Sequence, residues 1–192
     1  MDYNSIRRAS KEITIGNTTL GGAAPIRIQS MTNTDSCDFD ATYRQIKALE
    51  AAGCDIVRMT IPTHEAVDTI YKLKSSDIRI PLVADIHFDY RLAIESAEAG
   101  IDKIRINPGN IGEKWKTETV VKTALDKGVA IRIGLNCGSL PRHEKGIDEA
   151  KLMVDTALDY LSDFEKWNFT NTVVSLKSSD TEKTVRAAEL FA

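Results

Sequence analysis

The stretch PLVADIHFDYRLAIESAEAGIDKIRIN (81–107) decides the fold, because it holds a complete strand–helix–strand unit. Leu82–His87 and Lys103–Asn107 are short β-rich runs, and the amphipathic stretch between them ends at Gly100, which accepts the left-handed geometry of a helix C-cap. Two strands joined through a helix pair in parallel, as a right-handed βαβ unit. The stretch therefore predicts an α/β protein with a parallel sheet.

The same alternation continues on both sides of this unit. Further strands, each followed by a helix, are expected at Ile26–Met31, Asp55–Ile61, Ala130–Asn136 and Thr172–Lys177. The expected helices include Asp40–Ala52 before Gly53, a fourth that ends at Gly128, a fifth over Asp148–Trp167 and a sixth that begins at Ser179 or Asp180. Residues 11–20, KEITIGNTTL, predict a hairpin that turns at Gly16 and Asn17.

Repeated βαβ units build either an open doubly wound sheet or a closed barrel. In a doubly wound sheet both faces lie under helices, so its strands are apolar almost throughout, whereas most strands here alternate apolar and polar residues. The 192 residues are also fewer than the roughly 250 of a complete (β/α)₈ barrel. We therefore expect one incomplete TIM-barrel domain over residues 1–192, with six βα units behind an N-terminal hairpin segment (1–22).

The two faces of the expected strands differ sharply. The helix-facing side would carry Ile26, Ile28, Val57, Met59, Leu82, Ala84, Ile104, Ile106, Ile131 and Ile133. The inward side would carry Arg27, Gln29, Met31, Arg58, Thr60, Asp85, His87, Arg105, Asn107, Arg132, Gly134, Asn136, Ser175 and Lys177. Barrel interiors are usually filled with branched aliphatic side chains, so this mostly polar inner face indicates a binding function.

Four of the inward residues are cations: Arg58, Arg105, Arg132 and Lys177. Asp85 could neutralise only one of them. A buried unpaired charge costs several kcal/mol, so the cluster needs roughly two to four further negative charges, which a diphosphate supplies. These residues lie toward the carboxyl ends of their strands, where barrel active sites form. The glycines of the segments 105–112 and 133–140 place backbone amides beside them. A structural ion-pair network is the alternative interpretation.

Composition narrows the function classes. The formal net charge of −3 argues against a nucleic-acid binder with a broad basic surface, and no apolar run reaches the roughly 18 residues of a membrane span. The start of the chain lacks a secretory signal, so a cytoplasmic location is expected. Cys37, Cys54 and Cys137 are widely spaced without a CxxC pair, and the sequence indicates no metal site.

At the strand ends a family resemblance becomes specific. It is carried by IRIQSMTNTDSCDFDATYRQIKALEAAGCDIVRMTIP (26–62), PLVADIHFDYRLAIESAEAGIDKIRINPGNIG (81–112), IRIGLNCGSL (131–140) and VVSLKSSD (173–180). In order and spacing these segments resemble the 4-hydroxy-3-methylbut-2-enyl diphosphate synthase family of the non-mevalonate isoprenoid (terpenoid) pathway. The resemblance runs from about Ile13 to the end of the chain.

The resemblance implies an oxidoreductase that opens the ring of 2-C-methyl-D-erythritol 2,4-cyclodiphosphate. The electrons would come from reduced ferredoxin or flavodoxin through a 4Fe–4S cluster. The positions that match the family's substrate-binding residues are Arg58, His87, Arg105, Asn107, Arg132, Asn136 and Lys177, with Gln29, Asp85 and Ser175 in support. These positions coincide with the inward set obtained from the alternation.

Relative to that family, this sequence lacks strands seven and eight and the C-terminal iron–sulfur domain with its cluster cysteines and catalytic glutamate. The chain is therefore expected to hold no catalytic residue and no cluster ligand, and to be inactive alone. Family members dimerise, in a two-domain or a three-domain form. Two other interpretations are a dihydropteroate-synthase-like barrel, which predicts a pterin pocket, and a non-catalytic module that only binds a diphosphate.

Overall fold

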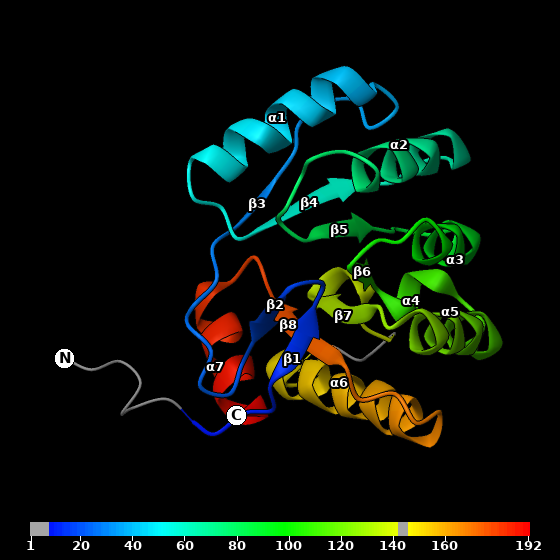
Figure 1. The fold of residues 1–192 in the computed structure, drawn as a ribbon. Helices are drawn as coiled ribbons and strands as arrows, with labels where there is room; N and C mark the ends of the chain where they lie inside the picture. Colours follow the sequence, from blue (N-terminus) through cyan, green and yellow to red (C-terminus); the bar gives the residue numbers. More distant parts are fainter. Residues whose placement is uncertain (1–7, 142–145) are drawn as a thin grey trace.

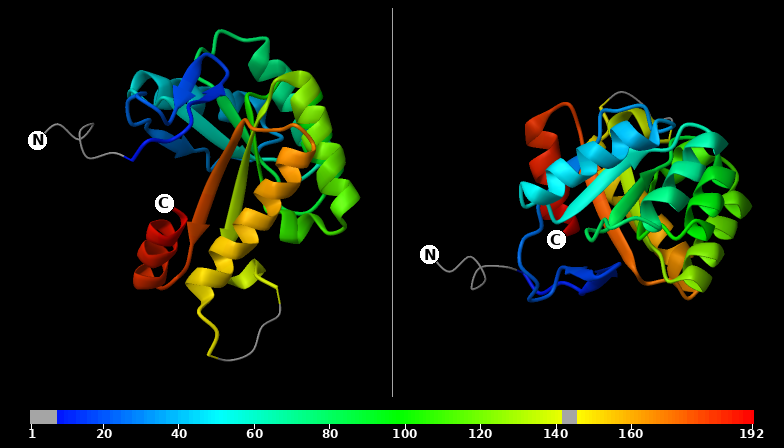
Figure 2. Two further views of the ribbon diagram at one scale, coloured as in Figure 1. Left: turned by 90° about the horizontal axis from the view of Figure 1, so that it is seen from below. Right: turned by 45° about the horizontal axis from the view of Figure 1, so that its top comes forward.

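The computed structural model describes residues 8–141 and 146–192 of the chain. Its centre is a parallel sheet curled into half a barrel (Figures 1 and 2). In spatial order, which is also chain order, the strands are β3 (Gln29–Met31), β4 (Ile56–Thr60), β5 (Leu82–Asp85), β6 (Lys103–Ile106), β7 (Ala130–Asn136) and β8 (Thr172–Lys177). A sheet in which successive strands are neighbours is the arrangement of a TIM barrel. The predicted partial barrel of six βα units is confirmed.

The helices lie outside the curl of the sheet (Figure 1). They are α1 (Phe39–Ala51), α2 (His64–Lys74), α3 (Tyr90–Glu98), α4 (Pro108–Ile111), α5 (Lys114–Lys127), α6 (Glu149–Lys166) and α7 (Thr181–Phe191), with a 3₁₀ turn, η2 (Cys137–Ser139). Asp180 caps α7 by accepting bonds from the amides of Glu182 and Lys183, as a helix start at this residue predicts. Gly128 ends α5 with a φ of +68°, in the expected left-handed conformation.

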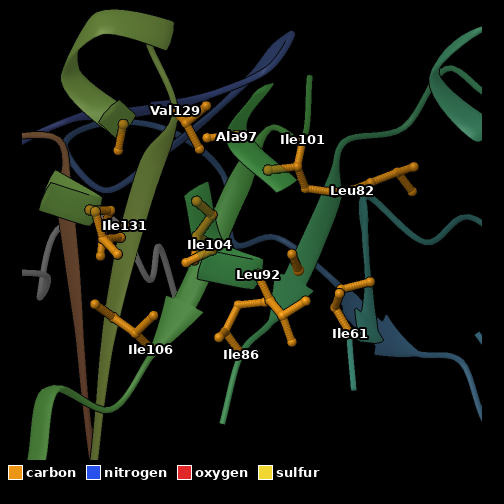
Figure 3. Close-up of a cluster of buried hydrophobic side chains, with 14 of the residues drawn as sticks. Ile61, Leu82, Ile86, Leu92, Ala97, Ile101, Ile104, Ile106, Val129 and Ile131 are labelled. Carbon is orange, nitrogen blue, oxygen red and sulfur yellow. The ribbon is translucent and has the colours of Figure 1, made fainter. Parts of the chain in front are cut away.

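The hydrophobic core fills the space between the sheet and these helices (Figure 3). Ile104 and Ile106 of β6 and Ile131 of β7 are fully buried on the outer face of the sheet, where they belong to one apolar cluster with Leu92 and Ala97 of α3. Burying side chains of this size contributes roughly 1.5–3 kcal/mol each. This packing fixes the outer face and so turns the alternate residues inward.

The hairpin of β1 (Ile13–Ile15) and β2 (Thr18–Leu20) closes the amino-terminal end of the barrel. Its turn needs the positive φ of Gly16, +53°, as the sequence predicts. Ile13 and Ile15 are buried in a second apolar cluster, whose other buried members are Ile56, Val83 and Ala130 of the sheet. Residues 8–22 thus act as a plug at the floor of the barrel, and residues 1–7 of the expected segment lie outside the described residues.

The first predicted strand, Ile26–Met31, is wrong in part, because the ladder begins only at Gln29. Ile26 and Ile28 were expected to face a helix, yet they are 73% and 63% exposed. β3 is an edge strand with β4 as its one neighbour, and the described helices leave these two side chains uncovered. Arg27, expected inside, instead bonds to the backbone oxygen of Thr19 at the floor.

Candidate functional site

The inward-facing residues form rows across the sheet, because neighbouring strands are paired in a fixed register. One row runs through the register partners Arg58, Val83, Lys103 and Ala130. The next row, one step nearer the carboxyl ends, runs through Thr60, Asp85, Arg105 and Arg132. The predicted inward positions of Arg58, Asp85, Arg105 and Arg132 therefore come together on adjacent strands.

Asp85 is the carboxylate at the centre of this cluster, and its side chain is only 6% exposed. Its Oδ1 accepts a hydrogen bond from Nη1 of Arg105 at 3.0 Å, and its Oδ2 lies 3.5 Å from Nε of Arg58. One negative charge thus faces two guanidinium groups. Asp85 was expected to neutralise one cation, and in the structure its carboxylate contacts two.

Arg132 has no carboxylate partner among the described residues. Its Nη2 donates to the hydroxyl oxygen of Ser175 at 2.7 Å, so the supporting role expected for Ser175 has a geometric basis. Burial lowers the pKa of Arg132 from its ordinary value, and the charges of Arg58 and Arg105 lower it further. The cluster therefore holds more positive charge than its own side chains neutralise.

Several donors in the cluster are buried and lack a hydrogen-bond acceptor in the described part of the chain. They are Nε of Arg58, Nε of Arg132 and Nδ2 of Asn107. The Nη2 of Arg58 donates at 3.2 Å to the thioether sulfur of Met31, which is a weak acceptor. Leaving a buried donor unsatisfied costs about 1–3 kcal/mol, so the interior is suited to a ligand rich in oxygen acceptors.

Asn107 and Gly134 have structural roles in this interior. Asn107 is fully buried and caps α4, with its Oδ1 accepting from the amide of Gly109 at 3.2 Å, so its side chain has a structural task beside the expected one. Gly134 of β7 lies against Arg105, since a Cβ at Gly134 would stand 2.6 Å from Nε of Arg105. A side chain at position 134 would therefore displace the guanidinium group.

His87, Asn136 and Lys177 lie on the carboxyl rim. Asn136 and Lys177 are register partners, and together with Cys137 and Gly138 they line a shallow pocket. His87 lies beyond the end of β5, which corrects the predicted strand Leu82–His87, and it is exposed beside Phe88. In the described part of the chain these three side chains form no hydrogen bond with the arginines. The geometry thus separates an interior cluster from a rim.

Lys103 is a residue of the interior that sequence reasoning missed. It is 2% exposed, and its Nζ donates to Oε1 of Gln29 at 3.3 Å, which also brings the predicted Gln29 into the site. Burial, followed by the charges of Arg132 and Arg58, lowers the pKa of Lys103 to about 8. The signal was available, because Lys103 stands two residues before Arg105 and strand alternation places both on one face.

The cysteines do not form a site for a metal cluster. Cys54 is buried and donates to the backbone oxygens of Ile28 and Ile56, while Cys37 lies 3.7 Å from the hydroxyl of Thr63. In residues 8–141 and 146–192 no group of His, Cys, Asp or Glu side chains is arranged to hold a metal ion. The described residues therefore do not fit an iron–sulfur cluster. Nor do they include a helix long and apolar enough to cross a bilayer.

Fold and interior together define a TIM-barrel domain whose inner face is cationic at the carboxyl ends of the strands. Comparison with known families agrees with this class. Residues 10–192 match the family described as the GcpE TIM-barrel domain, and the chain belongs to this family.

Curated relatives carry a consistent name, 4-hydroxy-3-methylbut-2-en-1-yl diphosphate synthase (flavodoxin). The protein of Bacillus cereus strain B4264 is 48% identical over 192 residues, which are 98% of this chain and 52% of the relative. The protein of Symbiobacterium thermophilum is 48% identical over 184 residues, 94% of this chain and 50% of the relative. The chain therefore spans about half the length of the curated relatives it matches.

A solved structure with a similar fold is the dihydropteroate synthase of Xanthomonas albilineans with 4-aminobenzoic acid. It has a TM-score of 0.66 and 13% identity, and the match covers 93% of this chain and 72% of that one. At this identity the likeness concerns the fold alone. It agrees with the barrel fold described above.

Proposed function

We propose that this chain is the substrate-binding barrel of a 4-hydroxy-3-methylbut-2-enyl diphosphate synthase, and that its interior binds the diphosphate of 2-C-methyl-D-erythritol 2,4-cyclodiphosphate. The observation that carries the proposal is the excess of positive charge on partly buried side chains in the barrel interior. Arg58 and Arg105 contact the single carboxylate of Asp85, and the Nε atoms of Arg58 and Arg132 form no hydrogen bond within the described residues. A diphosphate supplies both the missing charge and the missing acceptors.

The rim residues complete the proposed site. His87, Asn136 and Lys177 stand at the carboxyl ends of β5, β7 and β8, where side chains reach a ligand seated above the arginines. In this arrangement the arginines hold the diphosphate and the rim residues orient the rest of the molecule. Asn107 contributes the free Nδ2 of its amide while its Oδ1 caps α4.

In the whole enzyme the reaction would be the reductive opening of the cyclic diphosphate, with electrons from reduced flavodoxin or ferredoxin. A 4Fe–4S cluster supplies the electron-transfer chemistry, and its ligands belong to a part of the enzyme other than the residues described here. The barrel residues bind and orient the substrate, so this chain alone is proposed to be inactive. A homodimer in the cytoplasm is part of the same proposal.

Calorimetric titration of the chain with the cyclic diphosphate tests the binding step directly. Replacing Arg105 by Met removes a partly buried, hydrogen-bonded charge, which we expect to weaken binding by roughly 2–5 kcal/mol. Arg44→Met is the matched control, because it removes an exposed guanidinium of α1, a helix outside the curl of the sheet. The control should bind like the unmodified protein.

The rival functions give different results in the same titration. A dihydropteroate-synthase-like barrel would bind a pterin tightly and give no heat with the cyclic diphosphate, which would overturn the proposal. A module that binds a diphosphate without a role in this reaction would bind inorganic diphosphate as tightly as the cyclic compound. The proposal requires the cyclic compound to bind more tightly, because the rim residues then contact its carbon skeleton.

A further inference from the structure

Lys103 occupies the floor of the arginine cluster. Its register partners on either side are Val83 and Ala130, which are 1% and 0% exposed. These two residues also belong to the apolar cluster that Ile13 and Ile15 of the hairpin close from below. Lys103 therefore has apolar neighbours toward the floor, and its side chain extends across the interior to Gln29 of β3.

The groups that face Lys103 leave its charge uncompensated. From β3 the amide oxygen of Gln29, a neutral acceptor, receives its one hydrogen bond. From β4 and β7 it faces the cations Arg58 and Arg132, whose charges oppose its own. The other charged residues of the interior are Asp85 of β5 and Arg105 of β6, which pair with each other. From β8 come the neutral Ser175 and, at the rim, Lys177.

A lysine in such a position changes its protonation when the surrounding charge changes. Without a bound anion, the four basic groups Arg58, Lys103, Arg105 and Arg132 lie near one carboxylate, Asp85, which contacts only Arg58 and Arg105. The amine of Lys103 is the basic group that can release a proton near neutral pH. A bound diphosphate reverses the sign of the local field. The ammonium form is then favoured, because it gains an opposite charge above it.

We propose that Lys103 is a further anion-binding residue of this site, and that its amine takes up one proton from solvent when the cyclic diphosphate binds. The balance is simple: the neutral amine and a buffer acid give an ammonium ion and the buffer base, and no bond other than N–H forms. The inference rests on the proposed function, since it requires an anion in the arginine cluster. It adds to that function a floor residue whose charge appears only with the ligand.

The test is calorimetric titration of the whole chain with 2-C-methyl-D-erythritol 2,4-cyclodiphosphate at pH 8 in Tris and in HEPES. These buffers differ in ionisation enthalpy, so proton uptake appears as a difference between the two observed binding enthalpies. The ligand is well suited, because each of its phosphorus atoms carries a single strongly acidic oxygen and does not titrate near pH 8. A lysine with a pKa of about 8 should take up about half a proton per ligand at this pH.

Lys103→Met removes the titrating group and keeps a long side chain. We expect its binding enthalpy to be the same in both buffers and its affinity to be lower. The matched control is Lys122→Met, which removes an exposed lysine of α5 and should retain the proton uptake of the unmodified chain. The affinity of the unmodified chain for the cyclic diphosphate, measured from pH 8 to pH 10, gives a second readout. Because the amine must regain its proton on binding, we expect this affinity to fall by a factor that approaches tenfold for each pH unit.

The outcomes separate the two proposals. Binding with a buffer-dependent enthalpy that Lys103→Met abolishes supports both the anion site and the role of Lys103. Binding with equal enthalpies in the two buffers and an affinity independent of pH overturns the role of Lys103 and leaves the anion site standing. Absence of binding heat in both buffers, with no affinity found by equilibrium dialysis, overturns the anion site and the lysine with it.

Discussion

Arg105 of β6 and Arg132 of β7 are direct register partners, so two guanidinium side chains start from neighbouring positions on the inner face of the sheet. Their hydrogen bonds diverge, because Arg105 donates to Asp85 on one side and Arg132 donates to Ser175 on the other. Like charges on directly paired positions repel each other. We therefore expect this repulsion to be relieved by an anion that both side chains contact at once, as the proposed function requires.

The contact between Gly134 and Arg105 gives the first prediction. Gly134→Ala places a Cβ 2.6 Å from Nε of Arg105, so the guanidinium group that bonds to Asp85 must shift. We expect affinity for the cyclic diphosphate to fall at least tenfold, about 1.4 kcal/mol, in a calorimetric titration.

A double-mutant cycle checks that Gly134 acts through Arg105. In a chain that already carries Arg105→Met, the additional Gly134→Ala change should have no further effect on affinity. Equal losses in both backgrounds would contradict the mechanism and point to a general disturbance of β7.

Asp85 is predicted to stabilise the fold because its carboxylate neutralises part of the excess positive charge in the site. Asp85→Asn leaves two partly buried guanidinium groups without a counter-charge, and we expect the free energy of unfolding in urea to fall by roughly 3 kcal/mol. Asp155→Asn on α6 is the control, because it breaks an exposed pair with Lys151 and should cost less than about 1 kcal/mol.

The same variant should respond more strongly to ligand. A bound anion replaces the lost carboxylate, so the cyclic diphosphate should raise the melting temperature of Asp85→Asn more than that of the unmodified chain. A smaller rise in the variant would mean that Asp85 orients the arginines rather than competing with the ligand for them.

Lys103 predicts a pH dependence of stability in the ligand-free chain. Its pKa is about 8 in the folded state and 10.5 ordinarily, so the unfolded state binds more protons between these values and stability rises with pH there. From pH 7.5 to pH 9.5 the chain should gain about 2 kcal/mol relative to Lys103→Met, at ~1.4 kcal/mol for each pKa unit. Urea titrations of both proteins at the two pH values provide the measurement, and parallel pH profiles would contradict it.

Two isoleucines test the plug at the floor of the barrel. Ile15→Ala removes a fully buried side chain of the hairpin and should lower the free energy of unfolding by about 2–5 kcal/mol. Ile26→Ala removes the same atoms from a side chain that is 73% exposed, so the change in urea stability should stay within about 0.5 kcal/mol. Similar losses for both variants would argue against the hairpin as a buried plug.

Local sequence predicted the central strands well because their neighbours are close in the chain. In β6 and β7 the isoleucines at positions 104, 106, 131 and 133 mark the buried face, and strand geometry then assigns Arg105 and Arg132 to the other face. The first strand was predicted less well. Whether Ile26 and Ile28 are covered depends on elements that are not adjacent to them in sequence, and alternation carries no information about those.

The composition of the arginine cluster could be predicted, but its contacts could not. Alternation places Asp85 beside Arg105, whereas the sharing of its carboxylate with Arg58 depends on side-chain conformations. The inward position of Gly134 was likewise predictable, yet its contact with Arg105 depends on the conformation of the arginine side chain on the neighbouring strand. Lys103 was not predicted because it lies at the amino end of β6, away from the carboxyl ends where barrel sites form, and only its long side chain reaches the interior.

The hairpin plug has a consequence for the order of folding. Thr14 of β1 exchanges hydrogen bonds with Asn171, 157 residues further along the chain, and Ile15 rests in one cluster with Ala130. The hairpin is synthesised before the sheet, but it can pack in its final place only after the start of β8 has been made, since contacts of such sequence separation close late. We therefore expect a nascent chain that ends before β8 to keep an unsealed, hydrated barrel floor.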